Sequence, residues 1–200
     1  PAGIHLALFI LSLLFLLGLF CIPTSRGLLL GVIIIEVLSC SLDQNRWQPW
    51  EYNYIFILLA LVINYKKGDK AANVIAFILF CIYLFSGLGK MNYVFSSRVH
   101  YLIDNSAIIH LNKFRLYNFI TFHMGFLMGF IEVVLAVGLL FQKSKRISAY
   151  LLITMHLLII LTISPLVLEY DSIIIPWNLA FISILFVIFS RSAPVSIHLN

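Results

Sequence analysis

Long apolar blocks separated by short polar connectors form the dominant pattern of this chain. A helix needs about 17–25 residues to cross a hydrocarbon core of about 30 Å, and most of the blocks reach or approach that length. Strict alternation of apolar and polar residues, which is typical of membrane-spanning strands, is absent, so we expect helices to satisfy the backbone hydrogen bonds. The pattern predicts seven membrane-spanning helices, at residues 4–22, 28–42, 52–65, 71–91, 117–141, 147–163 and 176–190.

Residues 92–116 differ from these blocks because charged residues and histidines are mixed with the apolar ones. Their length and composition favour an amphipathic surface helix or a re-entrant element over a further span. The expected fold class is therefore all-α, a polytopic helical membrane protein with about seven membrane segments, six to eight being compatible with the pattern. We expect residues 1–200 to form a single integral membrane domain.

Composition strengthens the membrane interpretation. The chain is 62% hydrophobic and 10% charged, whereas soluble domains are roughly 45–50% apolar and about 25% charged. The net charge of +5 does not indicate nucleic-acid binding, because the basic residues lie in the short connectors. They are typical of signals that set membrane orientation. The partners that we expect are the lipid bilayer and other membrane protein subunits, and no nucleic acid.

The charges of alternate connectors predict the orientation. One set of connectors, together with the start of the C-terminal tail, holds eight basic residues and one acid, at positions 26, 66–70, 143–146 and 191. The other set holds four basic residues and five acids. Because the cytoplasmic side of a membrane protein is the more basic one, the first set faces the cytoplasm. The N-terminus is then outside and the C-terminus cytoplasmic.

Lys90 is the residue that draws most attention, since it closes the fourth apolar block within the segment Tyr83–Asn92. An ionisable side chain at membrane depth costs free energy, so one interpretation is that Lys90 belongs to a functional site. The other is that the ammonium group extends to the lipid headgroups. Gly87 and Gly89 favour a site, because glycines let another backbone or a ligand approach closely. A desolvated lysine amine can also serve as a base.

Other polar residues are expected near the same outer end of the membrane. Candidate ligand-binding residues are Asp43, Arg46, Trp47, His123, Trp177 and Asn178, and His156 is a candidate catalytic residue with Lys90. Polar groups from several spans would then converge on one outward-facing cavity. Each also has a structural reading, since buried histidines often bond neighbouring helices and the Asp43–Arg46 side chains suit helix caps.

Two further acids and two glycines inside the apolar blocks indicate contacts between helices. Glu36 and Glu132 lie inside apolar blocks, where each needs a proton or a partner such as Lys90, Arg46 or a histidine. Gly125 and Gly129 are four residues apart, which favours close packing within the bundle over dimerisation. The histidines are scattered without a metal-binding spacing, and no nucleotide-binding or nucleophile-elbow motif is present, so we expect no metal.

Three segments carry a resemblance to a known family: Leu42–Trp47, Tyr83–Asn92 and Thr154–Leu157. In this order and at this separation they resemble the membrane domain of vitamin K-dependent gamma-carboxylases, whose bacterial relatives are the horizontally transferred transmembrane (HTTM) proteins. The resemblance covers about residues 33–189. Its most specific part is an aromatic residue, a small residue, glycine and lysine at the end of the fourth block.

The resemblance implies that Lys90 is an active base toward a reduced quinone and that His156 lines the site. It also implies a bacterial inner membrane location and a site that opens outward. Within these 200 residues no segment resembles the lumenal domain of the carboxylases, so a quinone or another lipid-like ligand is implied and peptide carboxylation is not. The Trp47–Trp50 and Pro176–Asn178 segments indicate a smaller bacterial subgroup.

Two classes of function stay open at this point. The first is an HTTM-like protein that binds a quinone or lipid-like molecule in an outward-facing polar cavity around Lys90 and performs redox or acid–base chemistry. The second is a non-catalytic integral subunit of a larger membrane complex. Transport rests only on the intramembrane charges, and the absence of an evident inverted repeat argues against it.

Overall fold

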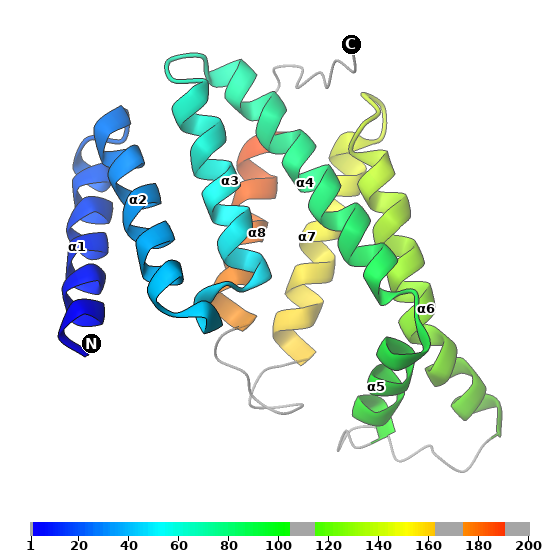
Figure 1. The fold of residues 1–200 in the computed structure, drawn as a ribbon. Coiled ribbons are helices and arrows are strands. Elements are labelled where there is room, and N and C mark those ends of the chain that lie inside the picture. The colour runs from blue at the N-terminus through cyan, green and yellow to red at the C-terminus, as the bar shows by residue number, and fades with distance from the viewer. Residues whose placement is uncertain (1, 105–114, 163–173, 191–200) are drawn as a thin grey trace. The chain divides into compact units, whose positions relative to one another are not determined.

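The computed structural model describes the backbone of residues 2–104, 115–162 and 174–190. In these ranges the chain forms eight α-helices and one 3-10 helix, and no strand (Figure 1). The elements are α1 (Ala2–Cys21), α2 (Arg26–Leu42), η1 (Gln44–Arg46), α3 (Pro49–Ile63), α4 (Gly68–Lys90), α5 (Tyr93–Asp104), α6 (Arg115–Gly138), α7 (Lys145–Thr162) and α8 (Ile174–Ser190). The all-α prediction is confirmed.

The helix positions follow the apolar blocks. Every α-helix except α5 overlaps one of the seven predicted spans, and α5 occupies the first half of the mixed segment 92–116. Residues 105–114 of that segment lie outside the described residues. Local chemistry fixes several ends: Ser25 Oγ accepts a hydrogen bond from Leu28 N at 3.3 Å and caps α2, and Pro49 opens α3 at a position where no backbone donor is needed.

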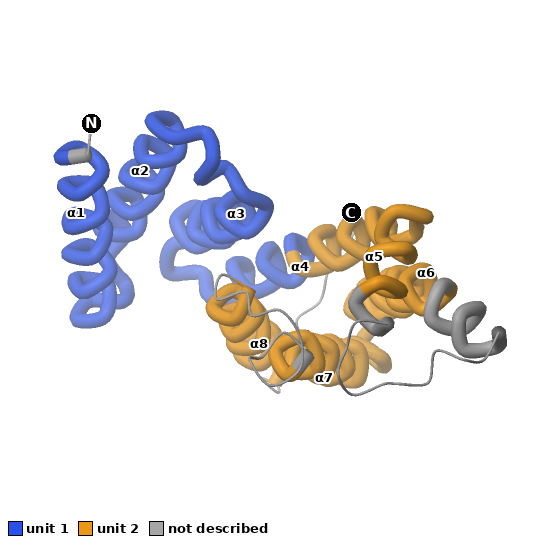
Figure 2. The backbone as a smooth tube through the Cα atoms, turned by 90° about the horizontal axis from the view of Figure 1, so that it is seen from below, with its two compact units in different colours: residues 1–78 blue, residues 79–200 orange. Residues whose placement is uncertain are grey.

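The chain divides into two compact units, residues 1–78 and residues 79–200, and α4 contributes to both (Figure 2). In the first unit α2 packs against α1 on one side and against α3 on the other. Its core contains Leu29, Ile33, Ile55 and Val62, with Trp47 packed against them. Nothing in these contacts tests the prediction of a single domain, which stays a prediction.

In the second unit α6 packs against α5 and α7, and α7 packs against α8. Its fully buried apolar side chains include Leu79, Leu139, Leu152, Phe181 and Leu185. Polar side chains are also buried in this unit, among them Glu132, His156 and Asn178. This distribution is unusual, because buried polar groups are costly unless each has a hydrogen-bond partner.

Glycines allow α4 and α6 to approach at their backbones. A methyl group added at Gly87 would lie 2.7 Å from the Gly129 carbonyl oxygen, and one added at Gly129 would lie 2.7 Å from the Gly87 carbonyl oxygen. One turn earlier in α6, a methyl group at Gly125 would lie 2.6 Å from the Cα of Ser96 in α5. Gly125 and Gly129 therefore pack against neighbouring helices of the bundle, as their spacing predicts.

Two of the described helices are long and apolar enough to cross a membrane, Gly3–Cys21 and Gly68–Lys90. Three more, Pro49–Ile63, His123–Gly138 and Ile174–Ser190, are apolar but shorter. Length and composition thus allow a membrane location, although an apolar helix near the start of a chain is also typical of a signal sequence. The seven-span topology, the orientation and the bacterial inner membrane stay predictions.

Candidate functional site

An ion pair joins the last residue of α4 to a residue in the second half of α6. Lys90 Nζ donates a hydrogen bond to Glu132 Oε2. The Glu132 side chain is only 3% exposed and the Lys90 side chain 26% exposed, so the lysine is the partner within reach of a ligand. The sequence left several possible partners for Glu132, and in the structure its partner is Lys90. Removing one member of a buried pair typically costs about 3–5 kcal/mol, because the other charge is left uncompensated.

A second polar set lies deeper in the same unit and links α4, α7 and α8. The hydroxyl of Tyr83 lies 2.7 Å from His156 Nε2, and His156 Nδ1 lies 2.6 Å from Asn178 Oδ1. The Asn178 amide nitrogen donates to the Ile174 carbonyl oxygen at 2.7 Å. All three side chains are buried.

The direction of these hydrogen bonds follows from chemistry. The Asn178 amide nitrogen donates to the Ile174 carbonyl oxygen, so the amide oxygen, which can only accept, is the atom next to His156. His156 Nδ1 must therefore carry the proton, and in the neutral ring Nε2 is then the acceptor for the Tyr83 hydroxyl. The tautomer of His156 is thus fixed by Asn178, and both ring nitrogens are engaged within the protein.

Aromatic rings surround His156. The Phe181 ring stacks on the imidazole at a centroid distance of 5.8 Å, and Trp177 meets the imidazole edge to face at 6.4 Å. Trp177 also packs against Phe181 at 5.3 Å. Two predicted site residues on α8, Trp177 and Asn178, therefore lie beside the predicted catalytic His156. Their proposed roles toward a ligand stay predictions.

The two polar sets act on each other electrostatically. The Glu132 carboxylate interacts electrostatically with Tyr83 and with His156. The Lys90 ammonium group interacts electrostatically with His156. Tyr83 and Lys90 are seven residues apart in α4, about two helical turns, so they lie on one face of that helix. Chemically, the arrangement offers one accessible amine, its carboxylate partner and a buried phenol held by a histidine.

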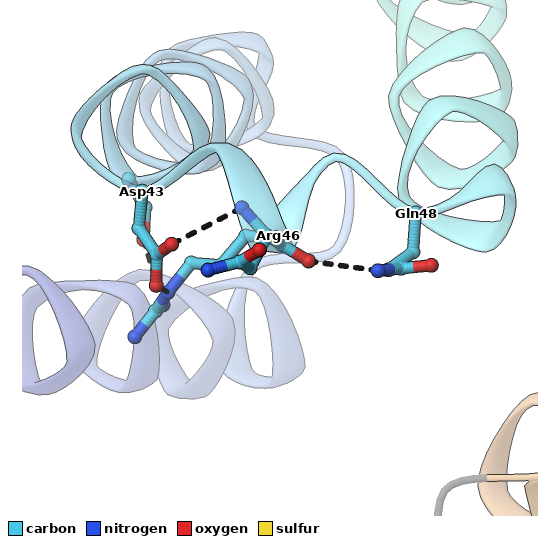
Figure 3. A network of polar contacts seen from close by, with 5 residues as sticks. Asp43, Arg46 and Gln48 are labelled. Atoms are coloured by element: carbon cyan, nitrogen blue, oxygen red, sulfur yellow. Dashed lines mark hydrogen bonds and ion pairs between the residues drawn. The ribbon is translucent and has the colours of Figure 1, made fainter.

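Asp43, Arg46 and Trp47 belong to the first unit, where Asp43 and Arg46 take part in a network of polar contacts (Figure 3). Asp43 Oδ1 accepts from Asn45 N at 3.1 Å and caps η1, and its carboxylate lies 3.6 Å from Arg46 Nε. Arg46 also donates to Ser39 Oγ at 2.8 Å. These contacts agree with the interpretation of the Asp43–Arg46 side chains as helix caps. The expectation that this connector and Lys90 line one cavity stays a prediction.

The surroundings of this connector are partly desolvated. Trp47 stacks on Tyr52, with ring centroids 4.8 Å apart. Burial raises the pKa of Glu51, and the nearby Glu36 carboxylate raises it further, while Arg46 opposes the shift. Glu36 itself finds its partner on α1, where Ser12 Oγ donates to Glu36 Oε1 at 2.6 Å. The two intramembrane acids predicted from sequence thus have different partners, a hydroxyl for Glu36 and an ammonium for Glu132.

Sequence reasoning placed some residues of the site and missed others. His123 is exposed on α6 and is not part of the Tyr83–His156–Asn178 set. Tyr83 and Glu132 were not among the predicted site residues, although both belong to the two polar sets. The available signal was spacing, because Tyr83 shares a face of α4 with Lys90, and Glu132 lies three residues after Gly129 on α6.

Comparison of the chain with protein family models, with curated proteins and with solved structures gave no match. The interpretation of the site therefore rests on its own geometry. The resemblance to HTTM proteins stays a prediction.

Proposed function

We propose that this chain is a polytopic membrane protein of the HTTM type that binds a quinone or similar lipid-like molecule at Lys90 and performs acid–base or redox chemistry there. The observation that carries the proposal is the buried Glu132 carboxylate paired with the partly exposed Lys90 amine. Charged pairs of this kind at membrane depth commonly mark ligand or proton sites.

The distribution of side chains supports the polytopic part of the proposal. Apolar side chains are widely exposed, among them Leu13, Leu17 and Phe20 of α1 and Phe126 and Phe130 of α6. Soluble monomers rarely expose contiguous apolar faces of this extent. Since Glu132, His156 and Asn178 are buried while the outer faces are apolar, lipid is the environment that best fits these helices.

The chemical class of the ligand follows from the N–H donors of Lys90 that Glu132 does not use. An ammonium group has three N–H donors, and Glu132 accepts one of them. A quinone carbonyl or quinol hydroxyl fits a remaining donor without adding charge to the site. The half-buried Trp177, which meets the His156 ring edge to face, suits a flat apolar ring.

The test is quinone binding by purified protein in detergent, with menadione as the probe and tryptophan fluorescence quenching as the readout. Lys90→Ala should weaken binding at least about tenfold, because a hydrogen bond to a charged group contributes about 1.5–3 kcal/mol. Lys70→Ala removes an exposed lysine near the other end of α4 and should leave binding unchanged. Equal dissociation constants for the folded Lys90→Ala variant and the unmodified chain would refute the proposal.

One observation favours the alternative of a non-catalytic subunit. Most apolar side chains of α1 are exposed, and α2 is the helix of its own unit against which it packs. Partner helices would cover such a surface as well as lipid does. Purification in a mild detergent separates the two functions, since a monodisperse monomer without co-purifying proteins counts against the subunit.

A further inference from the structure

The two ends of the first unit differ in charge. Consecutive helices of this unit reverse direction at short connectors, so the α1–α2 and α3–α4 connectors lie at one end and the α2–α3 connector lies at the other (Figure 1). The first end, which we call the basic end, holds four cations and one acid: Arg26, Lys66, Lys67, Lys70 and Asp69. The opposite end holds one arginine and two acids: Arg46, Asp43 and Glu51.

The cations of the basic end do not serve the fold of the unit. All four residues are exposed, and in the part of the chain that the structure describes neither of the two ion pairs includes one of them. Lys66 Nζ lies over its neighbour, 5.4 Å from the centroid of the Tyr65 ring. Arg26 and Lys70 lie in the first turns of α2 and α4, where the helix dipole disfavours a cation. These charges are therefore directed to something outside the unit.

Exposed apolar side chains lie next to these cations in the chain. Phe20 is 88% exposed, and Ile22 and Ile63, close before the two connectors, are also exposed. Cations beside exposed apolar side chains are typical of the level of lipid headgroups, where the apolar groups enter the acyl region and the charges meet phosphates. A soluble polyanion would bind the cations but would leave these apolar side chains in water.

We propose that the basic end is a lipid-recognition surface, which gathers anionic phospholipids around Arg26, Lys66 and Lys67. The inference goes beyond ligand binding at Lys90 and rests only on the membrane location within the proposed function. It also differs from the orientation expected from the connector charges, because it concerns the lipids that surround the folded protein.

The headgroup that this surface selects follows from charge. A phosphatidylglycerol headgroup has a net negative charge, whereas the choline of phosphatidylcholine cancels the charge of its phosphate. Each lysine or arginine near an anionic membrane surface is attracted to it, and the attraction falls off within a Debye length of about 8 Å at physiological salt. Lys66 and Lys67 are adjacent and exposed, so a headgroup at this connector meets two cations.

The experiment reads the lipid composition beside each end of the unit, in the purified full chain reconstituted into vesicles. Gly68 in the basic end and Gly3 at the opposite end are matched probe positions, because an added methyl group meets nothing within 4 Å at either. Gly68→Cys and Gly3→Cys are each labelled with bimane, after Cys21→Ser and Cys81→Ser have removed the two cysteines that are not buried.

The vesicles contain equal amounts of phosphatidylglycerol and phosphatidylcholine, and bromine on the acyl chains of one lipid or the other quenches the label. At Gly68 phosphatidylglycerol should be preferred about fivefold, the effect typical of one lysine close to an anionic surface. At Gly3 the two lipids should quench about equally. Both leaflets have the same composition, so the result does not depend on the orientation of the chain.

Charge variants of the connector test the cause of the preference at the Gly68 probe. Lys66→Gln combined with Lys67→Gln should lower it below about twofold, and arginine at both positions should retain it. Asp69→Asn removes the acid of this connector and should raise the preference. If the double glutamine variant does not fold, Asp69→Asn carries the same test in the opposite direction.

Equal quenching by the two lipids at Gly68 overturns the proposal, as does an equal preference at Gly3 or a preference that survives the loss of both lysines. Inorganic phosphate and chloride at the same ionic strength should weaken the preference equally, since both screen charge. A loss in phosphate alone shows a site for the free ion and also overturns the proposal.

The outcome is separate from that of the menadione assay, which is made in detergent without anionic lipid. If Lys90→Ala binds menadione normally while phosphatidylglycerol gathers at Gly68, the ligand site fails and the lipid surface stands. If menadione binding depends on Lys90 but the two lipids quench equally at Gly68, the lipid surface fails alone. If neither label is quenched by either lipid, the chain does not enter the bilayer and both proposals fail.

Discussion

Replacing Gly87 with alanine tests whether α4 and α6 meet at their backbones. The added methyl carbon would lie 2.7 Å from the Gly129 carbonyl oxygen and 2.9 Å from the Val133 backbone nitrogen. Carbon–oxygen contacts in proteins are ordinarily no shorter than about 3.3 Å, so the helices must separate by roughly half an ångström or more. Neither close atom belongs to a side chain that can rotate away. Overpacking of this kind costs about 1–3 kcal/mol.

Gly89 supplies a matched control two residues further along the same helix. An added methyl group there meets nothing within 4 Å, so Gly89→Ala brings only the better helix propensity of alanine, about 1 kcal/mol of stabilisation. Because both variants gain the helix propensity of alanine, they should differ in unfolding free energy by the overpacking cost alone, about 1–3 kcal/mol. Thermal unfolding in detergent, followed by circular dichroism, measures the difference. Equal stabilities would refute a direct backbone contact between α4 and α6 at this point.

Two further predictions concern the first unit. Ser12→Ala removes the donor to Glu36 and should lower the unfolding free energy by about 1–3 kcal/mol, whereas Ser41→Ala, at an exposed hydroxyl, should change it little. Urea unfolding in mixed micelles would show it, and equal losses in both variants would contradict the reasoning. Glu51 has a raised pKa in the folded chain, so the ionised form is disfavoured on folding and stability should fall as pH rises from about 4.5 toward neutrality. Glu51→Gln should flatten that slope, and an unchanged pH profile would count against the role of its burial.

The positions of the helices were accessible from sequence because each apolar block ends at a strong local signal. The Pro23–Gly27 turn separates α1 from α2, and the Lys66–Lys70 connector spans the junction of α3 and α4. Turn-forming and charged residues mark such ends without reference to the rest of the fold.

The hydrogen-bond partners within the site could not be predicted from the sequence in the same way. Spacing places Tyr83 and Lys90 on one face of α4, but it does not say which helix that face meets or at what height. The choice of Glu132 for Lys90, and of His156 for Tyr83, depends on the register of α6 and α7 against α4. That register follows from packing, including the Gly87–Gly129 crossing, and a pattern of apolar residues does not encode it.

Asn92 joins the two helices on either side of it. Its amide nitrogen donates to the Gly89 carbonyl oxygen at the end of α4, and its amide oxygen accepts from Phe95 N at 2.9 Å in the first turn of α5. A single side chain thus closes one helix and opens the next, which leaves the junction little freedom to bend. The final turn of α4 is consequently pinned at both ends, by Asn92 and by the crossing at Gly87. Motion of the Lys90 amine must then come from rotation about the bonds of its own side chain. The position of the amine is therefore set by the Lys90 rotamer, on a backbone that stays in place.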